Sequence, residues 1–316
     1  MRILDEVAGA KTIGISGHIR PDGDCVGSCL GMKLFLEKAM PEAKVDCYLE
    51  KPADFFSCIK GFDQIKTEAP AEMKYDAFIV LDSVPQRTGF AEPLYNSARK
   101  KINIDHHISN KGGSDADYII ADASSSCEVV YDVIDKDLLD KDIALAIYVG
   151  IIHDTGVMQY SNTKPKTLRT VADLLEFDFP FSRIIDETFY EKTFVQNQLL
   201  GEALLGSSLH HDGRIAVSIV TKELLERYHA TSMDLEGVVN QLRLTKGVDV
   251  AIFLYELEPG VYKASLRSTE AVDVAKVVVE FGGGGHVRAA GATLPGDPEA
   301  SVQLLIREIL KQMDGK

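Results

Sequence analysis

The sequence has no apolar run close to the roughly 20 residues that a membrane-spanning helix needs. Its first residues, MRILDEVAGAKTIGISGH, also lack the pattern of a secretory signal, because acidic residues come early and a strand-like run follows at once. These two absences predict a cytoplasmic protein that does not associate with a membrane. Internal repeats and low-complexity tracts are missing too, which leaves an ordinary globular chain.

Cysteine and basic residues are scarce. The five cysteines are odd in number and lack the spacing of a zinc site, so we interpret them as small core residues in a reducing compartment. Cys25 and Cys29 would lie one turn apart on a helix, and a metal or redox role for them is the alternative. The 34 basic and 48 acidic residues give a formal net charge of −14. This charge disfavours long duplex nucleic acid as a partner, whereas a short anionic substrate held in a local pocket remains compatible with it.

The first part of the chain alternates apolar runs with helical stretches. Four apolar runs are predicted strands: residues 12–16, 44–49, 77–81 and 101–104. Helices are predicted to start near Asp24 and to cover residues 125–136, 141–152, 165–176, 181–189 and 192–204. Apolar strands separated by helices are typical of a parallel sheet with helices on both faces. Residues 1–190 are therefore expected to form an α/β domain.

The last third of the chain has a different pattern. Strands are predicted at residues 214–220, 248–257 and 261–268, the last two joined as a hairpin, with helices at residues 273–281 and at the end of the chain. A chain of 316 residues is long enough for about two domains. We expect a smaller α+β domain over residues 211–316, joined to the first by a helical linker over residues 191–210.

Acidic residues and histidines follow four predicted elements of the first domain. These residues are His18, Asp22 and Asp24, then Asp82, then Asp105, His106 and His107, and finally His153 and Asp154. Ligands of open α/β sheets bind beyond the carboxyl ends of the strands, so all four clusters are expected to converge on one crevice.

So many carboxylates in one place would repel each other, and a divalent cation removes that conflict. Carboxylate and imidazole ligands without thiolates suit Mn²⁺, with Mg²⁺, Co²⁺ or Fe²⁺ as competitors, and ligand type alone does not exclude Zn²⁺. The His18–Asp22–Asp24 spacing favours two ions, with Asp82 as a bridge between them. Two such ions can activate water on one side and stabilise phosphate oxygens on the other.

Each cluster taken alone has a simpler interpretation. Asp22 or Asp24 by itself would more often cap a helix. Asp82 would mark the end of a strand, and the HDTG stretch would be a helix C-terminus with Gly156 in the turn. The metal hypothesis depends on all four clusters following apolar elements of a single domain.

Five motifs in a fixed order resemble a known family. They are GHIRPDGDCVGS, FIVLDS, INIDHH, GIIHDTG and FGGGGHVRAAGA. The first four resemble the DHH phosphoesterase superfamily, and the fifth resembles the C-terminal domain of its first subfamily. The short chain, without further domains, is most similar to the NrnA-type bifunctional oligoribonuclease and pAp phosphatases.

The resemblance implies roles for the residues of the first domain. His18, Asp22 and Asp82 would hold one Mn²⁺, and the second ion would be held by Asp24, Asp82, His106 and Asp154. His107 would contact the scissile phosphate, and Asp105 would orient the adjacent histidine. His153 departs from the small polar residue of many relatives; it would be a spectator or contact the substrate, and it is not assigned as a metal ligand.

The resemblance also implies that the C-terminal domain recognises the substrate. Arg267 and His286 would bind the nucleotide distal to the cut in an interdomain cleft, the backbone of Gly284 and Gly285 would approach an anion, and Arg288 would assist. A solvated strand arginine and a flexible glycine linker are the alternatives for these segments. Nothing in the residues indicates an oligomer, and a homodimer would be compatible with them.

The implied function is Mn²⁺-dependent hydrolysis of phosphate esters. The substrates would be short oligoribonucleotides, cut to 5′-mononucleotides, and 3′-phosphoadenosine-5′-phosphate (pAp), cut to AMP. One alternative is a phosphodiesterase of pApA or cyclic-di-AMP. An inorganic pyrophosphatase is disfavoured by the GGGGH run, and a non-catalytic nucleotide-binding module is disfavoured because none of the six ligand residues is missing.

Overall fold

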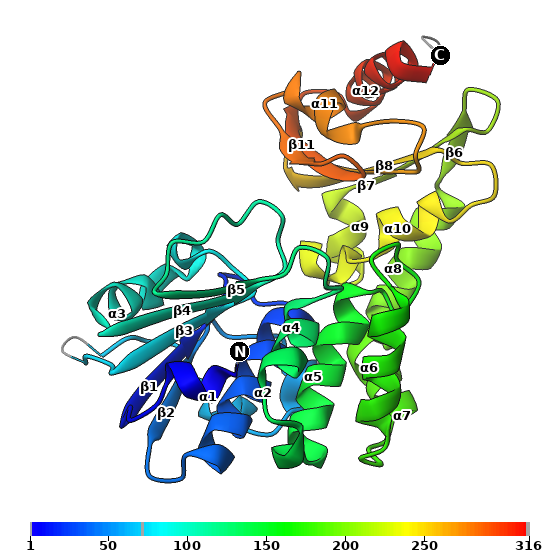
Figure 1. Cartoon of the computed structure of the whole chain (residues 1–316). Coiled ribbons are helices and arrows are strands. Elements are labelled where there is room, and N and C mark those ends of the chain that lie inside the picture. The colour runs from blue at the N-terminus through cyan, green and yellow to red at the C-terminus, as the bar shows by residue number, and fades with distance from the viewer. Residues whose placement is uncertain (1, 71–72, 314–316) are drawn as a thin grey trace. The chain divides into compact units, whose positions relative to one another are not determined.

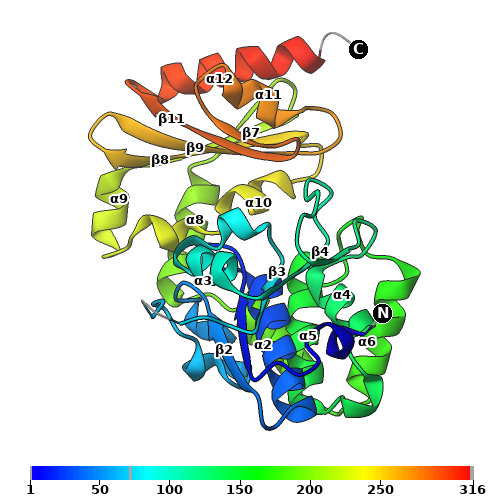
Figure 2. The same cartoon turned by 60° about the vertical axis from the view of Figure 1, so that its left-hand side comes forward.

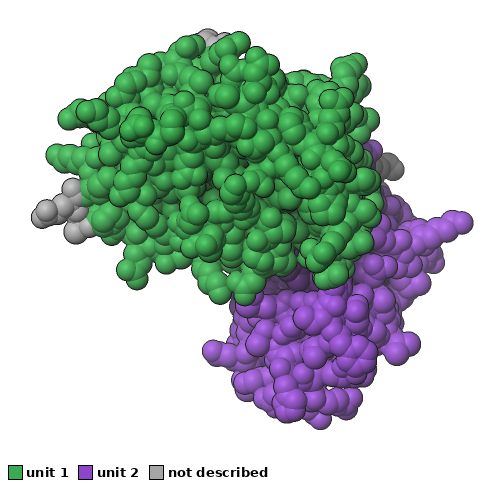
Figure 3. All heavy atoms as spheres, turned by 90° about the horizontal axis from the view of Figure 1, so that it is seen from below, with its two compact units in different colours: residues 1–191 green, residues 192–316 purple. Residues whose placement is uncertain are grey.

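The computed structural model describes residues 2–70 and 73–313. The chain divides into two compact units, Met1–Glu191 and Lys192–Lys316, which Figure 3 colours separately. The helix predicted at residues 192–204 is α8 (Phe194–Leu205), and it belongs to the second unit rather than to a linker. The reason is that Leu199 and Ala203 are buried in a core cluster of that unit.

The sheet of the first unit is entirely parallel, with the strand order β2-β1-β3-β4-β5. The strands are β1 (Thr12–Ser16), β2 (Lys44–Tyr48), β3 (Ala77–Leu81), β4 (Lys100–Asp105) and β5 (Ala116–Ile119). The predicted parallel α/β architecture is confirmed, and β5, a short edge strand, was not predicted. A parallel sheet places the carboxyl ends of β1, β3 and β4 along one edge.

Helices cover both faces of this sheet (Figure 1). Those of the first unit are α1 (Ile3–Glu6), α2 (Gly23–Ala39), α3 (Glu92–Ser97), α4 (Ser126–Val133), α5 (Lys141–Asp154), α6 (Pro165–Leu175) and α7 (Phe181–Ile185). On one face, α2, α4 and α5 pack on inward-facing strand residues such as Ile15 and Ile79. On the other face, Phe78 and Val80 form a smaller core with residues of α3.

Three helices of the first unit differ from the prediction by more than one residue. Helix α4 ends at Val133, because Asp135 caps a separate 3₁₀ turn by accepting from the N–H of Asp137. Helix α5 continues through Asp154, so His153 and Asp154 lie in its last turn rather than after it. The predicted helix over 181–189 is α7 followed by a π-helix (Asp186–Tyr190).

The second unit is a six-stranded mixed sheet with the order β10-β11-β9-β8-β7-β6. Its strands are β6 (Ser208–His210), β7 (Ile215–Val220), β8 (Val250–Glu258), β9 (Val261–Ser268), β10 (Gly284–His286) and β11 (Ala289–Pro295). Strands β8 and β9 form the predicted antiparallel hairpin. The end of the glycine run, for which no strand was predicted, begins the edge strand β10.

The two faces of this second sheet are covered differently (Figure 2). Helices α11 (Val274–Val279) and α12 (Pro298–Met313) cover one face along β7, β8, β9 and β11. On the opposite face, a core formed with α8, α9 (Lys222–Arg227) and α10 (Val238–Arg243) buries Ala216, Ala251 and Phe253 of β7 and β8. Among all helices of the described residues, none is long and apolar enough to cross a membrane.

Candidate active site

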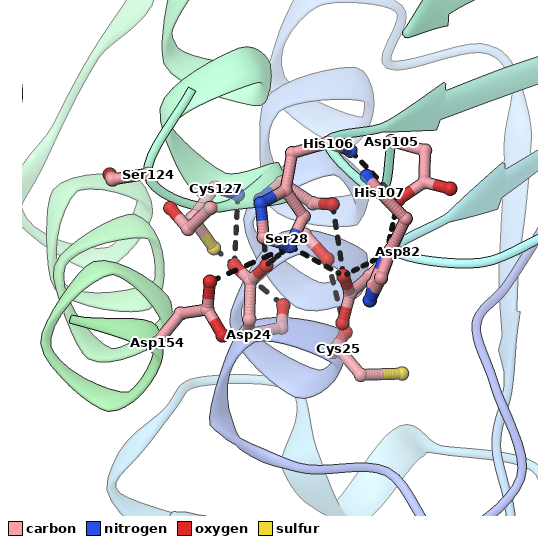
Figure 4. Close-up of polar contacts among 12 residues, drawn as sticks. Asp24, Cys25, Ser28, Asp82, Asp105, His106, His107, Ser124, Cys127 and Asp154 are labelled. Carbon is pink, nitrogen blue, oxygen red and sulfur yellow. Dashed lines mark hydrogen bonds and ion pairs between the residues drawn. The ribbon is translucent and has the colours of Figure 1, made fainter. Parts of the chain in front are cut away.

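The structure brings together all six residues expected to hold metal ions. His18 lies two residues after the end of β1, and Asp82 and His106 directly follow the ends of β3 and β4. Asp24 lies in the first turn of α2, and Asp154 lies in the last turn of α5. Figure 4 shows the carboxylates of Asp24, Asp82 and Asp154 gathered beside the ring of His106.

Asp82 lies at the centre of this cluster, with its two carboxylate oxygens facing different histidines. Its Oδ2 lies 3.3 Å from Nε2 of His18, and its Oδ1 lies 3.6 Å from Nε2 of His106. The backbone of Asp82 adopts a left-handed conformation with φ of 55°, which is uncommon outside glycine. Such strain is often retained at functional sites.

A second set of ligand atoms surrounds His106. Its Nε2 lies 3.5 Å from Oδ2 of Asp154 and 3.9 Å from Oδ2 of Asp24. Ligand atoms about 2.1 Å from an ion and at right angles to each other lie about 3 Å apart. The shortest separations around His18 and His106 are only slightly wider than this.

His18 and Asp22 are oriented by local backbone contacts. Nδ1 of His18 lies 2.8 Å from the carbonyl oxygen of Ile19, which leaves Nε2 facing the carboxylates. Oδ1 of Asp22 accepts the N–H groups of Asp24 and Cys25, both at 3.1 Å, so Asp22 is the N-cap of α2. The same oxygen lies 3.6 Å from Nε2 of His18, so Asp22 is both a helix cap and a member of the cluster.

Asp105 contacts the ring of His107 rather than that of His106. Oδ1 of Asp105 lies 2.7 Å from Nδ1 of His107 and also accepts the backbone N–H groups of His106 and His107. Oδ2 accepts a hydrogen bond of 2.6 Å from the amide of Asn110. The side chain of His107 is 44% exposed, whereas that of Asp105 is fully buried. This arrangement leaves His107 available to a substrate at the surface.

The cluster carries more negative charge than its buried position tolerates. Burial and the charge of Asp24 raise the pKa of Asp82 well above its ordinary range. Burial and Asp24 likewise raise the pKa of Asp154 to about 8. Burial alone would lower the pKa of His18, but hydrogen bonding to Asp22 and Asp82 outweighs it and raises the pKa to about 12.

These residues fit a divalent metal centre. Neighbouring buried carboxylates that share protons are stabilised when a cation binds, because the cation favours their ionised forms. Within the described part of the chain, three sets of ligand atoms lie within 4.8 Å of one another: His18, Cys25 and Asp82; Asp82, His106 and His107; and Asp24, His106 and Asp154. Cys25 is buried, as expected of a core residue, and its Sγ lies 3.9 Å from the carbonyl oxygen of His18.

Residues that the sequence analysis did not single out support the cluster. The buried amide of Asn103 donates to the carbonyl oxygens of Val80 and Ser83, on either side of Asp82. Ser126 donates from its hydroxyl to Asp82 and from its backbone N–H to Asp24. A polar Asn inside the apolar strand KINID was the only sequence signal for Asn103, and none marked Ser126 as a partner of Asp82.

His153, which was not assigned as a metal ligand, packs into an aromatic group. Its ring lies 5.0 Å from that of Phe56 and 5.5 Å from that of Phe189, centre to centre. Its Nε2 lies 3.1 Å from the hydroxyl of Thr188, and burial lowers its pKa to about 4. A Cβ on Gly23 would lie 2.2 Å from this ring, so Gly23 allows the turn that holds Asp22 and Asp24 to pack against His153.

Three of the five residues expected to bind substrate, Arg267, His286 and Gly284, lie on one sheet face of the second unit. Arg267 pairs with Ala289 across β9 and β11, and Ala289 pairs with His286 across β11 and β10. Directly paired residues point to the same face, so Arg267 and His286 flank the small side chain of Ala289, two strand spacings or about 10 Å apart. Ser265, Gly291 and Gly284 form the next row of that face.

The other two residues expected to bind substrate, Arg288 and Gly285, lie outside this face. Arg288 lies in the tight turn between β10 and β11, and its guanidinium donates to Glu270 at 3.2 Å. Gly285 has φ of 148°, and a Cβ there would lie 2.5 Å from the carbonyl oxygen of Ala289. Gly285 is therefore needed for the pairing of β10 with β11, whichever ligand this face binds.

Comparisons with known proteins agree with these motifs. A family model described as the DHH family, N-terminal domain, matches residues 12–151, and one described as the DHHA1 domain matches residues 212–315. The bifunctional oligoribonuclease and PAP phosphatase NrnA of Thermus thermophilus is 30% identical, over 94% of this chain and 89% of that protein. The protein of the same name from Bacillus subtilis is 27% identical, over 90% of this chain and 89% of that protein.

A solved structure shares the fold across both units. The crystal structure of an exopolyphosphatase-related protein from Bacteroides fragilis matches with a TM-score of 0.88 and 26% identity, covering 99% of this chain and 95% of that one. Together with the two family models and the Thermus relative, this match confirms the resemblance inferred from the five motifs. The chain belongs to the DHH family and is a phosphoester hydrolase.

Proposed function

We propose that the protein is a Mn²⁺-dependent hydrolase of short oligoribonucleotides and of pAp, acting in the cytoplasm. The position of Asp82 is the observation that carries the proposal, because its two oxygens face two different sets of metal-ligating atoms. The names of the Thermus and Bacillus relatives, which cover most of this chain, support this choice of substrates. Mg²⁺ and Co²⁺ are the competing ions, since the hard oxygen and imidazole donors suit them as well.

Two bound ions would supply an activated water and would stabilise charge on the phosphoryl oxygens. The remaining work belongs to side chains of the chain itself. His18, Asp22 and Asp82 would hold one ion, and Asp24, Asp82, His106 and Asp154 would hold the other. His107, held at Nδ1 by Asp105 and partly exposed, would donate from Nε2 to the scissile phosphate.

Recognition of the nucleotide is assigned to β9, β11 and β10 of the second unit, on the sheet face that carries Arg267 and His286. Arg267 and His286 lie about 10 Å apart on that face, with only the methyl group of Ala289 between them. A basic guanidinium and an imidazole around a shallow surface suit a phosphate and a stacked base. Backbone N–H groups at Gly284 would complete the anion contacts, and Arg288, paired with Glu270, would contribute less.

The test is a hydrolysis assay with Mn²⁺ on pAp, pApA, cyclic-di-AMP, a five-nucleotide RNA and pyrophosphate, with EDTA and Asp82→Ala as controls. The proposal predicts metal-dependent turnover of pAp and of the short RNA, and loss of both in Asp82→Ala with the fold retained. Near-normal activity of Asp82→Ala at saturating Mn²⁺ would refute the two-ion assignment.

Other outcomes separate the alternatives. Turnover restricted to pApA or cyclic-di-AMP would assign the protein to second-messenger breakdown. Binding of Mn²⁺ and nucleotide without turnover of any substrate would favour a nucleotide-binding module. A difference between Mn²⁺, Mg²⁺ and Co²⁺ in the same assay would identify the preferred ion.

A further inference from the structure

The N-terminus of α4 contacts both of the deeply buried carboxylates of the cluster. The backbone N–H of Ser126 donates to Oδ2 of Asp24 at 2.6 Å, and that of Cys127 donates to Oδ1 of Asp24 at 2.9 Å. The hydroxyl of Ser126 donates to Oδ1 of Asp82 at 3.0 Å. Asp24 and Asp82 are only 2% and 3% exposed, so these protein donors replace water around them.

The hydroxyl of Ser126 is not needed to cap the helix. Ser125 is the N-cap of α4, and its hydroxyl accepts the N–H of Glu128 at 3.0 Å. Ser126 follows it as the first helical residue, where a side-chain hydrogen bond to the backbone of the helix is not required. Its contact with Asp82, 44 residues away in the sequence, is therefore a tertiary one.

A second layer of buried hydrogen bonds fixes the position of Ser126. Oε2 of Glu128 accepts the N–H and the hydroxyl of Ser124 and the hydroxyl of Thr167. Ser124, Ser125 and Ser126 are all fully buried. The donor aimed at Asp82 thus lies in a buried segment that hydrogen bonds hold on both sides of it.

This contact acts on the one oxygen that faces the second set of ligand atoms. Oδ1 of Asp82 lies 3.0 Å from the hydroxyl of Ser126, 3.6 Å from Nε2 of His106 and 3.7 Å from Nδ1 of His107. A hydrogen bond to Oδ1 fixes the rotation of the carboxylate, and with it the direction of Oδ2 toward His18. Without that donor, the carboxylate of Asp82 would be free to rotate. The backbone of the same residue is already strained, with its left-handed conformation.

We infer that Ser126 is a positioning residue that orients Asp82 as the bridge between two divalent ions. This inference rests on the proposed two-ion function and adds to it a residue outside the ligand set. Partners that orient metal ligands typically change metal affinity or activity by about 10–100-fold when they are removed. The expected signature is weaker metal binding that excess metal reverses.

The experiment is a Mn²⁺ titration of the full chain, in which the six-line electron paramagnetic resonance signal reports free Mn²⁺. Ser126→Ala is expected to weaken the binding of Mn²⁺ by about tenfold or more. Its hydrolysis of pAp should then require more Mn²⁺ but recover at saturation, with KM for pAp unchanged. Because bound metal also stabilises a fold, recovery has to be accompanied by a Mn²⁺ affinity lower than that of a variant that loses only stability.

Ser125→Ala is the matched control, because it removes a neighbouring buried hydroxyl that does not touch Asp82. It is expected to lower the melting temperature through loss of the N-cap while keeping the Mn²⁺ affinity of the wild type. Ser126→Ala with wild-type Mn²⁺ affinity would overturn the inference while leaving the two-ion proposal standing. Failure of the wild type itself to bind two Mn²⁺ would instead overturn the proposed function.

Discussion

Nδ1 of His107 lies 2.7 Å from Oδ1 of Asp105, and the same oxygen accepts the backbone N–H of His107 at 3.1 Å. A carboxylate in this position accepts the Nδ1–H. The fully buried Asp105 therefore determines the direction in which the other ring nitrogen, Nε2, points. Hydrogen bonding to Asp105 also raises the pKa of His107. The carboxylate thus determines both the orientation and the charge of the histidine expected to contact the phosphate.

Asp105→Asn tests this relationship. An amide in place of the carboxylate can present its NH₂ group to Nδ1 and thereby favour the wrong tautomer of His107. We expect kcat for pAp to fall strongly, by up to about 10⁴-fold, the loss seen when a catalytic histidine loses its orienting carboxylate to asparagine. Metal content should stay at the wild-type level, because Asp105 is not among the ligand atoms of the cluster.

Metal analysis and kinetics on the same preparation would distinguish this role from a metal-binding one. A loss of bound Mn²⁺ that parallels the loss of kcat would place Asp105 among the groups that hold the ions. An unchanged kcat would show that the contact with His107 has no part in the reaction.

Arg267→Ala tests recognition by the second unit. Hydrogen bonds to charged groups contribute about 1.5–3 kcal/mol, so we expect KM for pAp to rise by about tenfold or more. Hydrolysis of bis-p-nitrophenyl phosphate, which contains no nucleotide for Arg267 to bind, should change little. Arg288→Ala is the comparison, and its effect should be smaller because its guanidinium is paired with Glu270. Equal losses on both phosphate esters for Arg267→Ala would contradict the recognition role.

The sequence could predict the convergence of the acidic clusters because parallel strands share an edge. His18, Asp82 and His106 each follow an apolar run, and in a parallel sheet the positions that follow the strands lie along the same edge. The pairing of Ser126 with Asp82 spans 44 residues, and only the packing of α4 against the sheet creates it. Contacts of this kind leave no periodic signal in a single sequence.

Strand β10 was missed for a related reason. Its residues Gly284 and Gly285 have low strand propensity, and the pairing with β11 is what makes them a strand. The last turn of α5 was missed because the apolar periodicity on which the prediction depended ends at Ile152, before the polar residues His153 and Asp154. Local propensity defined the apolar elements of this chain, whereas tertiary pairing defined its small polar segments.

The two neighbouring glycines of β10 should respond differently to replacement by alanine, one variant losing stability and the other losing affinity for the substrate. Gly285→Ala places a Cβ 2.5 Å from the carbonyl oxygen of Ala289 and should destabilise the second unit. No atom lies within 4 Å of a Cβ on Gly284, so Gly284→Ala should keep its melting temperature. Its methyl group would instead lie on the face of Arg267 and His286 and should raise KM for pAp. The measurements are the melting temperature and the KM for pAp of both variants. Equal destabilisation of the two would show that β10 is not paired as described.

Glu128→Gln tests the buried hydrogen-bond network beneath Ser126. Burial alone would raise the pKa of Glu128, but hydrogen bonds from Ser124 and Thr167 outweigh it and lower the pKa. A carboxylate with a lowered pKa in the folded state stabilises the fold above its ordinary pKa of about 4.3, and that contribution disappears as the pH falls through the folded-state value. Glutamine is uncharged at every pH, and its NH₂ group cannot accept a hydrogen bond. We therefore expect the free energy of unfolding to fall by about 1–3 kcal/mol at pH 7.

The measurement is unfolding of wild type and variant in EDTA as a function of pH. The transition of the first unit is identified as the one that added Mn²⁺ shifts upward. The difference in stability between the two proteins should shrink below about pH 4.3. A difference that stays constant with pH would mean that the shape of Glu128, and not its charge, supports the segment that holds Ser126.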